Sequence, residues 1–129
     1  MHKLNPRTAA LLSAFGWAVG YLLAGKALAV LLPAAPGGAA RFFRVCLLAP
    51  LVEEGVFRGA VQRRAQPLGR GQAILLQAVL FAVQHRGPAG MAYALVCGLV
   101  LGTIRSRTGS VWPGMLLHTL NNLLVFAAG

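Results

Sequence analysis

The chain contains only two acidic side chains, and they are neighbours, Glu53 and Glu54, inside an apolar stretch. An ionisable residue within a membrane-type segment is costly to bury and indicates a functional site. Glu54 and Arg58 are four residues apart, a spacing that places them on one helix face and predicts an ion pair. Glu53 points to a neighbouring face, so its carboxylate is free to take a proton from water.

Two histidines lie in other apolar stretches. His85 ends one of them, and His118 lies in the last one, with Asn122 one turn later on the same helix face. Asn121 points about 100° away and is the weaker candidate. Polar groups in lipid need partners, so these side chains are expected to converge. The candidate catalytic residues are Glu53, His85, His118 and Asn122, with Glu54 and Arg58 as supporting residues.

This set of side chains is suited to hydrolysis. A carboxylate can take a proton from water, one imidazole can hold that water, and an imidazole with an amide can stabilise an oxyanion. A zinc ion is the alternative, with Glu53, His85 and His118 as three ligands and water as the fourth. No H-E-x-x-H motif, the usual signal of a zinc protease, is present. Hydrolysis by these side chains without a metal would need no cofactor.

The composition excludes several classes of protein. Of 129 residues, 57% are hydrophobic and 11% are charged, whereas a soluble domain has about 25% charged residues. A disordered chain is poor in apolar residues, and Cys46 and Cys97 are too few for a disulfide framework. The net charge is +10, but the basic residues sit in small groups between apolar runs. This distribution is typical of membrane loops and predicts no nucleic-acid partner.

The apolar pattern predicts an all-α, polytopic membrane helix bundle of about five transmembrane helices. Pro50 is expected to disturb the second helix, and two Pro/Gly-rich breaks are expected at residues 33–40 and 67–71. We divide the chain into an N-terminal transmembrane helix with its loop, residues 1–40, and a core, residues 41–129. The predicted helices span about Thr8–Leu32, Arg41–Gln66, Gln72–His85, Ala89–Ile104 and Val111–Ala128.

Basic residues predict how the chain is oriented. More Lys and Arg residues fall on the side of the N-terminus than on the other side, which predicts a cytoplasmic N-terminus and an outside C-terminus. The first group is Lys3, Arg7, Arg63, Arg64, Arg70, Arg105 and Arg107, and the second is Arg41, Arg44 and Arg86. Within the fourth helix, Gly98 and Gly102 form a G-x-x-x-G pattern, for which packing within one chain is favoured over dimerisation.

Three motifs occur in order on these predicted helices. Residues 53–58 read E-E-x-x-x-R, residues 81–85 read F-x-x-x-H, and residues 118–122 read H-x-x-x-N. Together with the stretches 98–102 and 107–113, they resemble the CPBP intramembrane proteases over about Leu47–Leu124. That family includes the CAAX prenyl endopeptidases and bacteriocin-processing or self-immunity proteins.

The resemblance implies a role for each motif residue. Glu53 would activate the water, His85 would help to hold it, and His118 with Asn122 would form the oxyanion hole, without a metal. Glu54 and Arg58 would support the site. The expected protein is an endopeptidase of the bacterial cytoplasmic membrane that cuts membrane-anchored proteins or peptides near the membrane face, in CAAX-like or sorting-signal processing.

Other functions remain open on the sequence alone. The chain could be a non-enzymatic membrane immunity or scaffold protein whose polar cluster only packs helices. It could also be a small transporter that uses the carboxylates as a proton relay. Typical members of the family have more helices before the first motif. Either these helices are dispensable here, or a partner or a second copy in a homo-oligomer could replace them.

Overall fold

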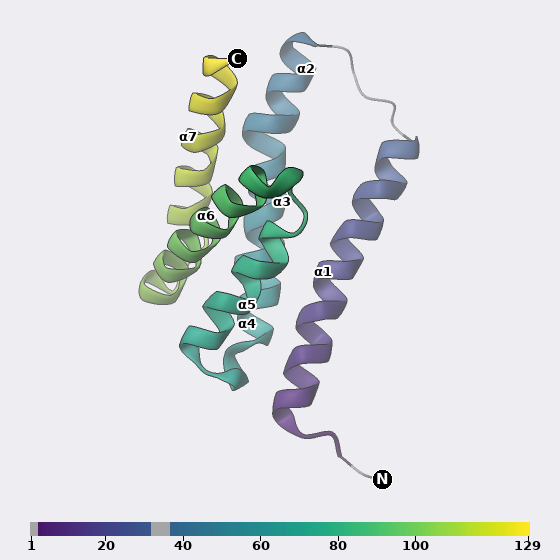
Figure 1. Cartoon of the computed structure of the whole chain (residues 1–129), viewed down its shortest axis with the longest axis vertical. Coiled ribbons are helices and arrows are strands. Elements are labelled where there is room, and N and C mark those ends of the chain that lie inside the picture. The colour runs from purple at the N-terminus through teal and green to yellow at the C-terminus, as the bar shows by residue number, and fades with distance from the viewer. Residues whose placement is uncertain (1–2, 32–36) are drawn as a thin grey trace.

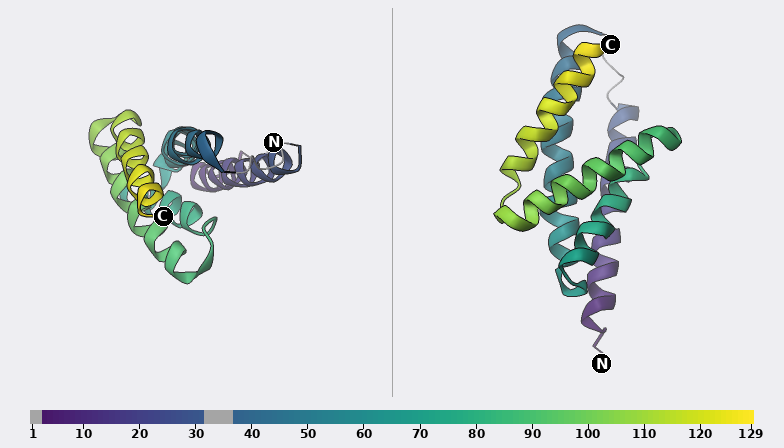
Figure 2. Two further views of the ribbon diagram at one scale, coloured as in Figure 1. Left: turned by 90° about the horizontal axis from the view of Figure 1, so that it is seen from above. Right: turned by 60° about the vertical axis from the view of Figure 1, so that its left-hand side comes forward.

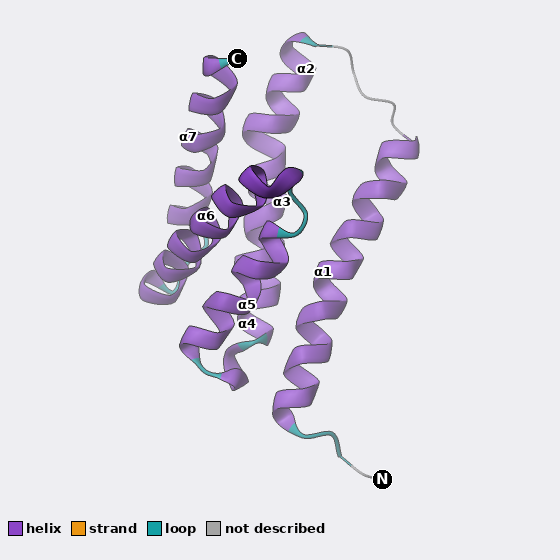
Figure 3. Ribbon diagram, in the orientation of Figure 1, coloured by secondary structure: helices purple, strands orange, loops and turns teal. Residues whose placement is uncertain are grey.

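The computed structural model describes residues 3–31 and 37–129, which form five helical rods (Figure 1). No strand occurs within these residues (Figure 3). The first rod is α1 (Pro6–Leu31). The second rod consists of consecutive segments: α2 (Gly38–Phe42), η1 (Phe43–Leu48), α3 (Ala49–Glu54), η2 (Gly55–Val61) and α4 (Gln62–Arg64). After the short turn η3 (Gln66–Leu68), the remaining rods are α5 (Arg70–Ala82), α6 (Gly87–Thr108) and α7 (Trp112–Ala128).

The second rod lies at the centre of the molecule. On one side α1 packs against η2, and on the other α7 packs against α3 and η1. The pair α5 and α6 packs together, and α6 crosses the second rod at a steep angle (Figure 2). The start of α1 and the end of α7 lie at opposite ends of the molecule (Figure 1). α7 therefore packs directly beside the acidic residues of α3, whereas α1, α5 and α6 contact the adjoining segment η2.

The second rod is one long helix interrupted by two wide, π-type segments, η1 and η2, which flank α3. Such segments are common at functional sites. Pro50 has no backbone N–H to give to the preceding wide turn, so the carbonyl of Val45, five residues earlier, is available to another donor. Asn122 Nδ2 donates to it at 2.9 Å. The disturbance that the sequence predicts at Pro50 therefore also attaches α7 to the second rod.

Most predicted helix boundaries lie within a few residues of the observed ones, with three corrections. His85 lies outside α5, because the helix ends at Ala82 and the N–H groups of Gln84 and His85 turn back to carbonyls three residues earlier. Residues 38–40, predicted as loop, begin α2, whose first residue Gly38 has a positive φ of 69°. The second rod ends at Arg64 instead of Gln66. Residues 32–36 of the predicted helix end and loop lie outside the described residues.

The G-x-x-x-G pattern packs α6 against α5 within the chain. A Cβ atom on Gly98 would lie 2.9 Å from the Cα of Ala78, so only glycine permits this approach. The side-chain amide of Gln77 fills the space beside Gly102 and donates from Nε2 to the carbonyl of Gly98 at 2.7 Å. Gln62 Nε2 donates to the carbonyl of Gly102 at 2.8 Å. Buried amides thus join three rods. This arrangement supports the prediction that the G-x-x-x-G pattern packs helices within one chain.

Polarity in this molecule is reversed from that of a soluble domain. Large apolar side chains face outward, with Val30 83% and Leu124 73% exposed, while Glu54 and Arg58 are fully buried. Residues Pro6–Val30 and the helix α6 are each long and apolar enough to cross a membrane. An extensive apolar exterior marks contact with lipid or another apolar surface. The helical elements confirm the all-α prediction for the described residues. The apolar exterior and the two long apolar helices indicate a membrane protein.

Candidate active site

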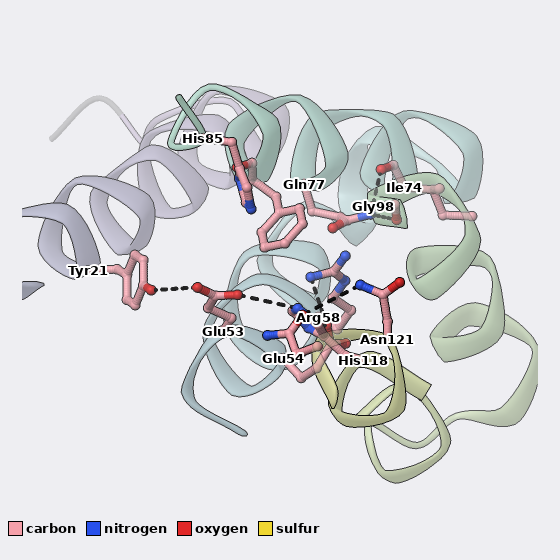
Figure 4. Close-up of polar contacts among 12 residues, drawn as sticks. Tyr21, Glu53, Glu54, Arg58, Ile74, Gln77, His85, Gly98, His118 and Asn121 are labelled. Carbon is pink, nitrogen blue, oxygen red and sulfur yellow. Dashed lines mark hydrogen bonds and ion pairs between the residues drawn. The ribbon is translucent and has the colours of Figure 1, made fainter. Parts of the chain in front are cut away.

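The predicted site residues come from three rods and meet beside α3 (Figure 4). Glu53 and Glu54 are the last residues of α3, and Arg58 follows in η2. His85 lies in the turn after α5, and His118 lies on α7. The structure brings the side chains of Glu54, Arg58 and His118 into contact, with Glu53 beside His118, whereas His85 packs against Phe81.

Glu54 is the buried centre of a charged cluster. Its Oε1 lies 2.9 Å from Arg58 Nη1 and 2.9 Å from His118 Nδ1. The predicted pairing of Glu54 with Arg58 is therefore confirmed. An ionised carboxylate can only accept hydrogen bonds, so His118 Nδ1 must carry a hydrogen and donate it to Glu54. Glu54 thereby fixes the orientation of the imidazole and leaves its Nε2 directed toward Glu53.

The second oxygen of Glu54 lies against the first turn of α7. A Cβ atom on Gly114 would lie 2.9 Å from Glu54 Oε2, so a side chain at this position would collide with the carboxylate. The N-terminus of a helix carries a partial positive charge that favours a carboxylate. Glycine at position 114 therefore allows the acidic residue and the start of α7 to approach each other.

Glu53 faces the other ring nitrogen of His118. Its Oε2 lies 3.6 Å from His118 Nε2, which is longer than a hydrogen bond. One water oxygen could lie within about 2.8 Å of both atoms. The Glu53 side chain is 19% exposed, in contrast to fully buried Glu54. The two adjacent carboxylates thus have different environments, as their spacing predicts.

His85 is held by the phenylalanine of its own motif. Its Nδ1 lies 3.1 Å from the carbonyl of Phe81, and the two rings meet edge to face with centroids 4.7 Å apart. Donation from Nδ1 leaves Nε2 free of that bond. Figure 4 shows the ring directed from the end of α5 toward the site.

Phe81 has a larger part in the site than its place in the motif indicates. Its ring packs edge to face against His118, with centroids 5.8 Å apart, as well as against His85. The guanidinium of Arg58 lies 4.5 Å from its centroid, a cation–π contact. Within the described residues the Arg58 N–H groups form no aligned hydrogen bond, so this contact and Glu54 are its main compensation.

The structure places the two asparagines of α7 differently from the prediction. Asn122 directs one N–H to Val45, which binds it to the second rod, although it still lines the cavity described next. Asn121, the weaker candidate on the sequence, accepts a hydrogen bond from Tyr93 of α6 and lines the same cavity. The oxyanion role assigned to Asn122 stays a prediction.

A largely apolar cavity of about 440 Å³ adjoins both imidazoles. It lies between α6, α7 and the end of α5, and Cys97 is one of the residues that line it. Its other walls include Ala94, Val100, Leu117 and Val125. A cavity of this size and lining suits an apolar group of a substrate.

The zinc alternative does not fit the side chains. Across residues 3–31 and 37–129, no group of three His, Cys, Asp or Glu side chains lies close enough together to bind a metal ion. Glu53 and His118 approach each other, but His85 directs Nδ1 to a backbone carbonyl. We therefore derive no step through a metal.

Some contributors to the site carry no motif. Tyr21 of α1 donates from its hydroxyl to Glu53 Oε1 at 3.2 Å, although 32 positions separate them. Gln62 and Gln77 support the rods through amide–carbonyl bonds, and Gly114 makes room for Glu54. The only sequence signal for the two glutamines is a polar residue within an apolar helix. For Tyr21, no spacing in the sequence predicts its contact with Glu53.

The family model described as type II CAAX prenyl endopeptidase, Rce1-like, matches residues 35–124, which include all three motifs. The chain belongs to this family. Membership implies a CAAX-type protease and agrees with the resemblance of its motifs to the CPBP proteases. No curated protein and no solved structure gives a significant match to the chain.

Proposed function

We propose that this Rce1-like protein is an intramembrane endopeptidase in which Glu53 activates water. The observation that carries the proposal is the 3.6 Å separation of Glu53 Oε2 and His118 Nε2, with Glu54 on the far side of the same imidazole. A carboxylate faces each nitrogen of this ring, and the guanidinium of Arg58 pairs with one of the two, Glu54. A protonated His118 would balance the second carboxylate and would present Nε2–H as a donor.

The proposed reaction needs no group beyond these side chains and water. Glu53 takes a proton from water, which His85 Nε2 helps to hold, and the oxygen attacks the peptide carbonyl. His118 Nε2–H donates to the resulting oxyanion, and the second N–H of Asn122 is the further candidate donor. Glu53 then passes the proton to the leaving amine. The products are a carboxylic acid and an amine, and Glu53 returns to its starting state.

The proposed substrates are membrane-anchored proteins or peptides cleaved near their C-terminus. The apolar cavity beside His85 and His118 supports a substrate with an apolar or lipid-modified residue. The outward-facing apolar side chains support a protein embedded in the bilayer, and we propose that all five rods cross it or enter it. In this proposal the protein lies in a bacterial cytoplasmic membrane with its N-terminus in the cytoplasm.

The test compares the membrane proteins of cells that express the wild-type chain, Glu53→Gln, or the control Ser13→Ala. Ser13 lies on α1 and contacts Arg64, away from the acidic residues. We expect C-terminal fragments by mass spectrometry with the wild type and Ser13→Ala, and none with Glu53→Gln. In proteoliposomes, Glu53→Gln should reduce hydrolysis of a CAAX peptide by at least about a hundredfold.

The same experiment tests the structural alternative. Glu53→Gln keeps the size of the side chain, so it should insert and fold as the wild type does. Full proteolysis by a folded Glu53→Gln variant would contradict the proposed role of Glu53. Loss of folding together with no cleavage by the wild type would favour the non-enzymatic scaffold protein.

A further inference from the structure

The first rod supplies a side chain to the candidate site. Tyr21 lies on α1, outside residues 35–124, to which the family match is confined. Its hydroxyl donates to Glu53 Oε1 at 3.2 Å. Figure 4 shows the phenol on one side of Glu53 and His118 on the other. The two oxygens of this carboxylate are therefore directed to different partners, Oε1 to α1 and Oε2 to α7.

Packing holds the phenol in place. The Tyr21 ring meets the buried ring of Phe57 edge to face, with centroids 5.4 Å apart and planes at 78°. One and two turns earlier on α1, Ala18 and Ala14 are buried in the same core cluster as Phe57. Small side chains at these positions allow α1 to lie close to the second rod. The hydroxyl therefore reaches Glu53 from a ring that is fixed by its neighbours.

We propose that Tyr21 is a positioning residue that sets the orientation of the Glu53 carboxylate, an inference that rests on the proposed function. A glutamate side chain has several rotatable bonds, and a carboxylate attached to only one partner can turn away from the reacting water. Anchoring Oε1 leaves Oε2 aimed at the side of His118. A charge-assisted hydrogen bond of this kind is stronger than one between neutral groups.

Tyr21 acts through Glu53 in this proposal. It lines a groove between α1 and the second rod, together with Val52 and Val56, whereas His85 and His118 line the cavity between α6 and α7. Its hydroxyl thus approaches the carboxylate at Oε1, whereas His118 faces Oε2. Removing the hydroxyl should reduce the rate of the chemical step and leave substrate binding unchanged.

The test measures kcat and KM of the full chain in proteoliposomes, on the better cleaved of a farnesylated and an unmodified CAAX peptide. Tyr21→Phe keeps the ring and its contact with Phe57 but lacks the donor. We expect kcat to fall about tenfold to a hundredfold, with KM within about twofold of the wild type, because small errors in geometry cost about this much. Ser13→Ala, which removes another hydroxyl from α1, should change neither constant.

A second variant separates the hydrogen bond from packing. p-Aminophenylalanine at position 21 restores a donor on the same ring, and it should recover kcat to within about threefold of the wild type. If Tyr21→Phe does not fold, the amine variant is compared directly with the wild type, and a tenfold lower kcat overturns the proposal.

Two further results would overturn the positioning role alone, provided that Glu53→Gln is inactive. One is a Tyr21→Phe variant with wild-type kcat. The other is a low kcat in Tyr21→Phe that the amine does not restore. If Glu53→Gln itself cleaves normally, the proposed function fails, and the positioning role of Tyr21 fails with it.

Discussion

At the scale of single residues, the two adjacent glutamates differ because their partners differ. Glu54 has no exposed surface and lies 2.9 Å from both Arg58 and His118, so it can neither reach a substrate nor move without separating charges. Glu53 retains contact with the open side of the site and has Tyr21 as its hydrogen-bond donor. Two consecutive residues of one helix therefore act as a structural acid and a candidate catalytic base.

This difference predicts that the same substitution costs far more stability at Glu54 than at Glu53. Glu54→Gln should lower the free energy of unfolding by about 3–5 kcal/mol, because it leaves the buried Arg58 charge without its counter-ion. Glu53→Gln should lower it by less than about 1 kcal/mol, since Glu53 is partly exposed. Unfolding in mixed micelles by added denaturing detergent, followed by tryptophan fluorescence, would measure both values. Equal stability of the two variants would contradict the structural role of Glu54.

At the scale of the helices, glycine and glutamine determine how the site is assembled. Gly98 allows α6 to approach α5, and the Gln77 amide joins the two helices. α5 carries Phe81, and the turn that follows it carries His85. Changes in the packing of α5 and α6 should therefore alter both stability and the position of the imidazole.

Gly98→Ala should lower the free energy of unfolding by about 1–3 kcal/mol, the usual cost of overpacking, because the new methyl group would lie 2.9 Å from the backbone of Ala78. Gly90→Ala is the matched control on α6, since a Cβ atom there meets its nearest neighbour at an ordinary 4.0 Å. The same detergent titration would measure both variants. A Gly98→Ala variant as stable as the control would show that α6 does not need this close approach.

Local sequence determined part of this site and left the rest to tertiary contacts. The i, i+4 spacing predicts the pairing of Glu54 with Arg58, since a helix fixes that distance. It does not predict Tyr21, because nothing local relates positions 21 and 53. The sequence pattern also predicts a helix that reaches His85, but α5 ends three residues earlier, at Ala82. The prediction fails there because the end of a helix depends on the turn that follows it. The partner of Asn122 follows from Pro50, on a different rod.

At the scale of the whole molecule, the arrangement of the rods supports an odd number of membrane crossings. The start of α1 and the end of α7 lie at opposite ends of the structure (Figure 1). Basic residues are more numerous in the segments that five crossings would place on the side of the N-terminus. The opposite ends agree with an odd number of crossings, and the basic residues agree with the proposed cytoplasmic N-terminus.

Reporter fusions would test this orientation. An enzyme that is active only in the cytoplasm should be active when fused before residue 1 and inactive after residue 129, and an exported reporter should give the opposite pattern. An internal control is the same pair of reporters in the short turn at residues 67–69, which should report cytoplasm. A cytoplasmic reporter that is active at both ends would contradict five crossings.

The inward placement of both glutamates also determines the electrical character of the ends of the molecule. The side chains there that carry charge near neutral pH are basic, since the chain has 12 Lys and Arg residues and only two acids. Dissolved salt screens charges in water but has little effect on a buried ion pair. Raising the ionic strength should therefore weaken the attraction of the loops for anionic lipid headgroups while the Glu54–Arg58 pair stays intact. Surface attachment and internal chemistry can thus be varied independently by the choice of buffer.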